Sequence, residues 1–135
     1  MNSLEIGLYI VSTPIGNLAD LSSRAKLILE SVDIVICENP NHSLKLLNNL
    51  GIKKKLLSLH DYNEIAIIKR IEKYQRNSSI ALISDAGSPL ISDPGYNLVR
   101  DYIDKNLMIT TVPGASSIIS ALQLSGLPIH NFVFY

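Results

Sequence analysis

Two loops rich in serine, glycine and proline contain the residues best suited to bind a ligand. Ser84-Asp85-Ala86-Gly87-Ser88-Pro89 and Val112-Pro113-Gly114-Ala115-Ser116-Ser117 each follow a short apolar run. Glycine allows close approach to the backbone, serine offers a hydroxyl, and backbone amides at a helix start receive polar ligand groups. One such loop alone is typical of a tight strand-to-helix turn. The presence of two favours a pocket for a small ligand.

Acidic and histidine side chains after two other apolar runs are candidates for proton transfer. Glu38 begins the segment Glu38-Asn39-Pro40-Asn41-His42, and His60 begins His60-Asp61-Tyr62-Asn63-Glu64. A carboxylate or an imidazole can serve as a general acid or base. Taken singly, each segment is also typical of a solvated helix cap. The three histidines, including His130, lie in separate segments without helical metal spacing, so we expect no metal site.

Known phosphate-binding fingerprints are missing from the remaining loops. Thr13-Pro14-Ile15-Gly16-Asn17-Leu18 lacks the three spaced glycines of a dinucleotide fingerprint and the lysine of a P-loop. Lys53-Lys54-Lys55 can contact phosphate, although such a run is more typical of a solvated turn. The type of ligand therefore has to be inferred from other features.

Short apolar runs alternate with helical patterns along the chain and set the positions of these loops. Strands are expected at residues 8–12, 34–37, 56–59, 80–83 and 107–112, with a sixth beginning at 132–135. Helices are expected at 21–32, 41–49, 62–75, 93–103 and 115–125, with Asp20 and the pair Asp93-Pro94 starting the first and the fourth. This order predicts an α/β domain with a five-stranded, mainly parallel sheet and helices on both faces. Ligands of such sheets bind beyond the carboxyl ends of the strands, where the loops lie.

Composition limits the kinds of partner and compartment. The 135 residues carry 12 basic and 12 acidic side chains, so no net positive charge indicates nucleic acid binding by the chain as a whole. The single cysteine, Cys37, excludes an internal disulfide and favours a reducing compartment. Since the sequence has no signal peptide pattern and no apolar run of about 18 residues, we expect a cytoplasmic protein without a membrane span.

Three ungapped segments, at residues 9–25, 84–95 and 112–117, resemble the tetrapyrrole methylase superfamily, and the resemblance extends over essentially the whole chain. Ser12-Thr13-Pro14-Ile15-Gly16-Asn17-Leu18 favours the branch that methylates ribosomal RNA. The resemblance implies S-adenosylmethionine-dependent 2′-O-methylation of a cytidine ribose in 16S rRNA of the small ribosomal subunit. It also implies a homodimer of two-domain subunits. Residues 1–127 would form the N-terminal domain and 128–135 the start of an interdomain segment, with the C-terminal domain absent from this chain.

The resemblance also assigns roles to individual residues. The positions that match contacts to the methyl donor are Ile15, Ser88, Ile91, Ser116 and Ser117. The residues that would shape the same wall of the donor site are Asp85, Gly87 and Pro89. A ribose hydroxyl is a weak nucleophile, so a base would assist the transfer, and Glu38 and His60 are the candidates.

Two departures from the family pattern leave other functions open. The family usually reads Glu-Asp-Thr-Arg-His where this chain reads Glu38-Asn39-Pro40-Asn41-His42, so an acid and an arginine that could contact RNA are missing. The chain also stops where the family enters its second domain. The alternatives are a catalytically inactive truncated remnant or dimerising domain, and a methylase acting on a precorrin-type tetrapyrrole.

Overall fold

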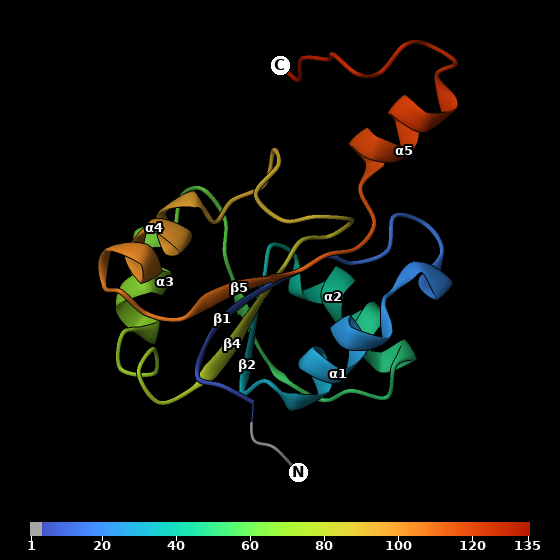
Figure 1. The fold of residues 1–135 in the computed structure, drawn as a ribbon. Coiled ribbons are helices and arrows are strands. Elements are labelled where there is room, and N and C mark those ends of the chain that lie inside the picture. The colour runs from blue at the N-terminus through green and yellow to red at the C-terminus, as the bar shows by residue number, and fades with distance from the viewer. Residues whose placement is uncertain (1–3) are drawn as a thin grey trace.

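Strands and helices alternate in the computed structural model, which describes residues 4–135 (Figure 1). The strands are β1 (Gly7–Val11), β2 (Ile34–Cys37), β3 (Lys55–Ser58), β4 (Ser79–Ile83) and β5 (Ile109–Val112). The helices are the short 3-10 helix η1 (Leu18–Asp20), α1 (Ser23–Ser31), α2 (Pro40–Asn49), α3 (Glu64–Ile71), α4 (Tyr96–Asp104) and α5 (Ser117–Leu124). The predicted α/β class and the five strands are confirmed.

The sheet has the strand order β3-β2-β4-β1-β5, and every pair of neighbouring strands is parallel. Helices α1 and α2 pack on one face, and α3 and α4 pack on the other. The neighbouring strands β1 and β4 are therefore followed by helices on opposite faces. Loops that diverge in this way leave a crevice at the carboxyl ends of the two strands, where ligands of open α/β sheets bind.

Alternating side chains of the central strands fill both layers of the core. Leu8 and Leu82 pack with Leu98 beneath α3 and α4, whereas Tyr9 and Ile83 belong to the cluster under α1 and α2. Strands that are covered on both faces consist of consecutive apolar residues, so they can be recognised in the sequence. The buried sheet provides a rigid base for the loops at its carboxyl edge.

The starts of two helices differ from the sequence prediction. Asp20 ends η1 and does not cap α1; instead the Ser22 hydroxyl accepts a hydrogen bond from the Ala25 N–H at 3.0 Å. The pair Asp93-Pro94 does not begin α4, which starts at Tyr96 after Gly95. Both predictions used local capping preferences; α1 is capped by the nearby Ser22, whereas the Leu98 N–H on the first turn of α4 donates to Glu64 of α3.

Helix α5 and the segment after it extend away from the sheet (Figure 1). Helix α5 contains no buried residue, and the exposed fraction of Leu124 is 87%. The expected strand at 132–135 is not formed, since no neighbouring strand pairs with this segment in the described part of the chain. No helix among residues 4–135 is both long and apolar enough to cross a membrane.

Candidate functional site

The loops after β1 and β4 are joined by hydrogen bonds into one unit. Thr13 and Gly87 form an antiparallel bridge in which each backbone N–H donates to the other residue's carbonyl oxygen at 3.0 Å. The Thr13 hydroxyl also donates to the Ser84 carbonyl oxygen at 3.2 Å. Gly87 has a φ of +80°, a left-handed conformation that favours glycine. These contacts fix the first of the two loops identified in the sequence against the end of β1.

Ser88 connects this unit to the loop after β5. Its hydroxyl donates to the Ala115 carbonyl oxygen at 3.2 Å and lies 3.0 Å from the Ser12 hydroxyl oxygen. Gly114 allows the close approach, because a Cβ atom at that position would lie 2.9 Å from the Cβ atom of Ser12. The two loops identified in the sequence therefore meet at the carboxyl edge of the sheet.

A cavity of about 120 Å³ lies between the β4–α4 loop and the start of α5. Its lining consists of Ala86, Gly87, Ser88, Ile91, Asp93, Ser116, Ser117 and Ile118. Five residues assigned to the donor site by resemblance thus surround one cavity. Ile15 is not among these lining residues; its Cγ2 atom lies 3.1 Å from where a Cβ atom of Gly87 would be. Pro89, together with Glu38 and Asp93, borders a narrow neighbouring space that has no room for a water molecule.

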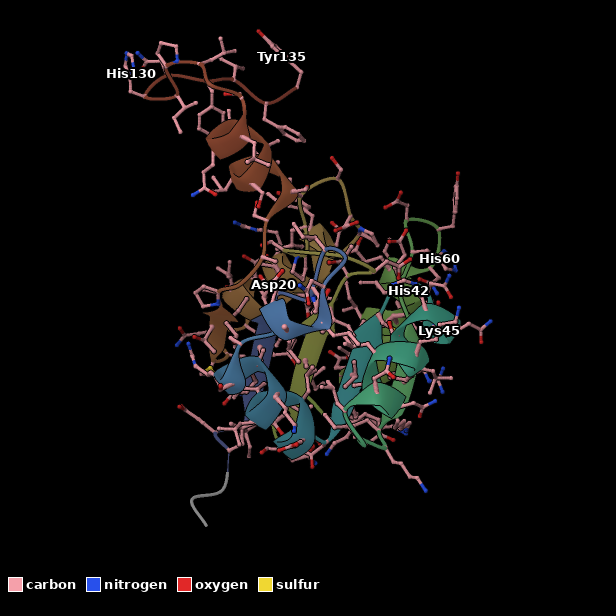
Figure 2. The ribbon with its side chains drawn as sticks, turned by 90° about the vertical axis from the view of Figure 1, so that its right-hand side faces the viewer. Asp20, His42, Lys45, His60, His130 and Tyr135 are labelled. Atoms are coloured by element: carbon pink, nitrogen blue, oxygen red, sulfur yellow. The ribbon has the colours of Figure 1, made fainter. Side chains whose placement is uncertain are left out.

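Asp85 lies on the other side of the same loop, in a cleft of about 260 Å³ between the β1–η1 segment and α2. Residues lining this cleft include Thr13, Asn17, Leu18, His42, Lys45 and Asp85. The Oδ1 atom of Asp85 is buried and has no hydrogen-bond partner within the described residues. The His42 Nε2 atom lies 2.8 Å from the Asp85 carbonyl oxygen and so links α2 to the loop. Figure 2 shows His42 and Lys45 on α2.

The two candidate bases lie at the ends of neighbouring strands, Glu38 after β2 and His60 after β3. Partial desolvation raises the pKa of the Glu38 carboxyl, and the negative charges of Asp85, Asp93 and Asp61 raise it further. His60 is exposed, and no hydrogen bond joins its side chain to Glu38 among residues 4–135. Of the two, Glu38 is the one that borders the donor-site loop, because it lies around the same narrow space as Pro89 and Asp93.

Asp93 is a candidate that the sequence analysis missed, because it was assigned to the start of a helix. It lines the donor-side cavity and borders the narrow space beside Glu38. Desolvation raises the pKa of the Asp93 carboxyl, and the charge of Asp85 adds to the effect. Gly95 in the sequence could have indicated this role. When a glycine takes the N-cap position of a helix, an aspartate two residues earlier does not cap that helix and is free for another role.

The β4–α4 loop holds two non-glycine residues in the left-handed region, Leu90 with a φ of +77° and Ser92 with a φ of +61°. Gly95 makes room for this arrangement, because a Cβ atom there would lie 2.8 Å from Leu90 Cδ2. Such conformations cost energy and persist only where surrounding contacts fix them, often at ligand sites. The β4–α4 loop therefore adopts its shape at the cost of backbone strain.

Asn63 and Glu64, which follow the candidate base His60, have structural roles. The Asn63 side-chain oxygen accepts a hydrogen bond from the His60 N–H at 2.8 Å, and its amide donates to the Ser58 carbonyl oxygen at 3.0 Å. The buried Glu64 carboxylate accepts from the Leu98 N–H at 2.9 Å. These contacts fix the turn before α3 and the start of α4.

Comparisons with known proteins agree with this arrangement. The family profile described as Tetrapyrrole (Corrin/Porphyrin) Methylases matches residues 7–133. The ribosomal RNA small subunit methyltransferase I of Pasteurella multocida is 47% identical over 135 residues, which are 99% of this chain and 48% of that protein. The protein of the same name from Escherichia coli O157:H7 is 44% identical over 94% of this chain and 45% of its own length. The chain thus spans about half the length of these relatives.

Solved structures show the same fold at lower sequence identity. A uroporphyrin-III-C-methyltransferase from Thermus thermophilus superposes with a TM-score of 0.64 at 22% identity, covering 94% of this chain and 55% of that one. A second structure of a Thermus thermophilus uroporphyrin III C-methyltransferase, in its native form, gives the same TM-score at 19% identity, covering 92% and 53%. At this identity the likeness concerns the fold alone.

Proposed function

This chain belongs to the tetrapyrrole methylase family, and we propose that it forms the N-terminal half of an S-adenosylmethionine-dependent enzyme that methylates the ribose 2′-hydroxyl of a cytidine in 16S rRNA. The observation that carries the proposal is the convergence of two loops, after β4 and after β5, on one cavity. Gly87, Ser88, Ile91, Ser116 and Ser117 come from segments far apart in the sequence and line the same space.

The residues around this cavity offer polar and apolar contacts to part of S-adenosylmethionine. Gly87 and Gly114 leave open the positions that Cβ atoms would otherwise occupy against Ile15 and Ser12. Ser116 occupies the N-cap position of α5, but its side chain makes no capping hydrogen bond. Its hydroxyl and the first amide groups of α5 are therefore available to a polar ligand group. Ser117 and Ile91 would complete the wall.

When bound, S-adenosylmethionine supplies an electrophilic methyl group on a sulfonium centre. The contribution of this chain would be to hold the acceptor hydroxyl in position and to accept its proton. We assign the second role to Glu38, because its raised pKa makes it a stronger base than an ordinary glutamate. Asp93 borders both the space beside Glu38 and the donor-side cavity, and its negative charge contributes to the raised pKa of the Glu38 carboxyl.

Sequence identity to the relatives favours RNA over a tetrapyrrole as the substrate. The relatives named for ribosomal RNA are 44–47% identical, whereas the uroporphyrin-III-C-methyltransferase structure is 22% identical. We extend the proposal to a cytoplasmic enzyme that acts on the small ribosomal subunit. It includes a domain boundary near residue 127 and a homodimer, and the exposed apolar side chains of α5 and residues 127–135 are consistent with both.

Calorimetric titration with S-adenosylhomocysteine tests the donor site directly. We expect one binding site in the wild-type chain and a loss of at least tenfold in affinity in Ser116→Leu, because the larger side chain would fill the cavity. Gln123→Leu is the matched control, since it adds a similar apolar side chain to the same helix outside the cavity lining. Equal affinity in both variants, or no binding to the wild-type chain, contradicts the proposed site.

The non-catalytic alternative rests on the segment Glu38-Asn39-Pro40-Asn41-His42. Asn39 caps α2 through hydrogen bonds that its side-chain oxygen accepts from the Asn41 and His42 N–H groups, so this segment forms a regular helix start. Donor binding without methyl transfer to ribosomal RNA, measured after adding a chain that covers the other half of the relatives' length, would favour this alternative.

A further inference from the structure

The chain has a net charge of zero, but its basic and acidic residues are unevenly distributed along the sequence. Between residues 53 and 76 there are seven lysines and arginines and three acidic residues, whereas the remainder has five basic and nine acidic residues. The basic residues of this segment are Lys53, Lys54, Lys55, Lys69, Arg70, Lys73 and Arg76. We call this group the basic patch. Locally clustered charge of one sign produces a field that attracts ions of the other sign.

The fold brings the two halves of the basic patch together around Tyr74. The Lys55 Nζ atom lies 5.3 Å from the centre of the Tyr74 ring, and the Lys73 Nζ atom lies 4.9 Å from it. A hydrogen bond from Lys73 lowers the pKa of the Tyr74 hydroxyl, and the positive charges of Lys55, Lys73 and Arg70 lower it further. The start of β3 and the segment after α3 thus form one positively charged surface.

The acidic residues of the same segment do not neutralise this surface. Asp61 precedes α3, at the opposite end of that helix from Tyr74. Glu64 is buried and bonded to the Leu98 N–H, and Glu72 pairs with Lys105 at 3.4 Å. Within residues 4–135, no ion pair includes a member of the basic patch. All of its members except the half-buried Lys54 are exposed.

We propose that the basic patch binds the phosphate backbone of RNA at a position remote from the methyl donor. This inference rests on the proposed function for the choice of RNA as the partner. The patch lies at the amino end of β3, whereas the donor-side cavity lies at the carboxyl edge of the sheet. Phosphate contacts from lysine and arginine fix the position of a nucleic acid without reading its sequence. Phosphate contacts at the basic patch, in addition to binding of the target ribose at the donor site, would orient a large RNA on the domain.

The surroundings of the basic patch favour RNA over a lipid surface. Binding to a membrane surface normally combines basic residues with exposed large apolar side chains on the same face. In the segment 53–76, the exposed large hydrophobic residues are Tyr62 and Ile65, which lie at the start of α3, at the opposite end of that helix from Lys73 and Tyr74. Tyr74, around which the patch is arranged, is half-buried and already faces two ammonium groups.

The test compares two variants that each remove two positive charges. Lys55→Gln with Lys73→Gln alters the patch, and Lys26→Gln with Arg100→Gln is the control on α1 and α4. The affinity of each chain for a single-stranded RNA oligonucleotide of about 20 nucleotides is measured over a range of salt concentrations. Each phosphate contact to a single strand contributes roughly 0.7 to the slope of log affinity against log salt. We expect the patch variant to lose about 1.4 from this slope and the control to lose nothing.

Three further measurements make the outcome unambiguous. Thermal unfolding of both variants verifies that the exposed substitutions leave the fold intact. Equal salt slopes in the wild-type chain and the patch variant overturn the proposal, as does binding to anionic lipid vesicles with no binding to RNA. S-adenosylhomocysteine binding is titrated on the same samples. If the wild-type chain does not bind S-adenosylhomocysteine, the proposed donor site is contradicted, whereas the RNA result still decides the role of the basic patch.

Discussion

The carboxylate of Glu64, on the first turn of α3, accepts a hydrogen bond from the backbone N–H of Leu98, on the first turn of α4, at 2.9 Å. Its second oxygen accepts from the Asn97 side-chain amide at 3.2 Å. Gly95 at the N-cap of α4 has no side chain to provide this cap. A residue 34 positions earlier therefore caps the helix and fixes the end of the β4–α4 loop.

Replacing Glu64 tests this long-range cap. We expect Glu64→Ala to lower the free energy of unfolding by about 1–3 kcal/mol, because the buried Leu98 N–H loses its acceptor. Glu64→Gln keeps an acceptor oxygen and should lose less. Urea denaturation measures both, with Glu30→Ala as the control, since Glu30 forms an exposed ion pair with Lys26. A Glu64→Ala variant as stable as the control would show that the cap contributes little.

Gly87→Ala tests the contact between the loops after β1 and β4. Gly87 has a φ of +80°, and an added Cβ atom would lie 3.1 Å from Ile15 Cγ2. We expect a loss of roughly 1–3 kcal/mol from backbone strain and crowding combined. Gly126→Ala is the matched control, because Gly126 has a φ of +69° and no atom within 4 Å of the added Cβ. The difference between the two variants in chemical denaturation isolates the contact with Ile15; equal losses would mean that strain alone is responsible.

Glu38→Gln should change the pH dependence of stability. The Glu38 carboxyl has a raised pKa in the folded chain, so the folded state binds more protons than the unfolded state between the two pKa values, and stability falls as pH rises through that window. Removing the charge should therefore stabilise the chain near pH 7 and give no gain below about pH 4. Because the group is exposed, we expect the gain to stay below about 1 kcal/mol. Thermal unfolding at both pH values measures it, and a gain of the same size at both would contradict this account.

Ser92→Gly should relieve strain in the β4–α4 loop. Ser92 has a φ of +61°, which glycine adopts at little steric cost. We expect a gain of roughly 0.5–1 kcal/mol after allowing for the greater freedom of glycine in the unfolded chain. Asn106→Gly, at a φ of +52°, is the comparison and should gain less, because asparagine tolerates this region. Unfolding free energies of the two variants would contradict the expectation if Asn106→Gly gained more.

Residues adjacent in the sequence account for most of the correct predictions. The strand at 34–37 matches β2, because four consecutive apolar residues bounded by polar ones are typical of a strand buried on both faces. The loops after β4 and β5 were identified for a similar reason, since glycine, proline and serine immediately follow apolar runs. The predicted start of α1 was wrong because Asp20 and Ser22 both have suitable capping side chains. The predicted start of α4 was wrong because its N-cap is Gly95 and its capping carboxylate comes from Glu64 on α3.

The sequence by itself therefore determined the fold class, the family and the loops that contain the candidate site, because all of these depend on local patterns along the chain. Only the tertiary structure decided which side of the β4–α4 loop each residue occupies, with Ser88 facing one cavity and Asp85 the other. It also decided that Lys55 and Lys73 meet at Tyr74. Such contacts join residues from separate strands and helices, and the packing of the sheet and helices sets their geometry.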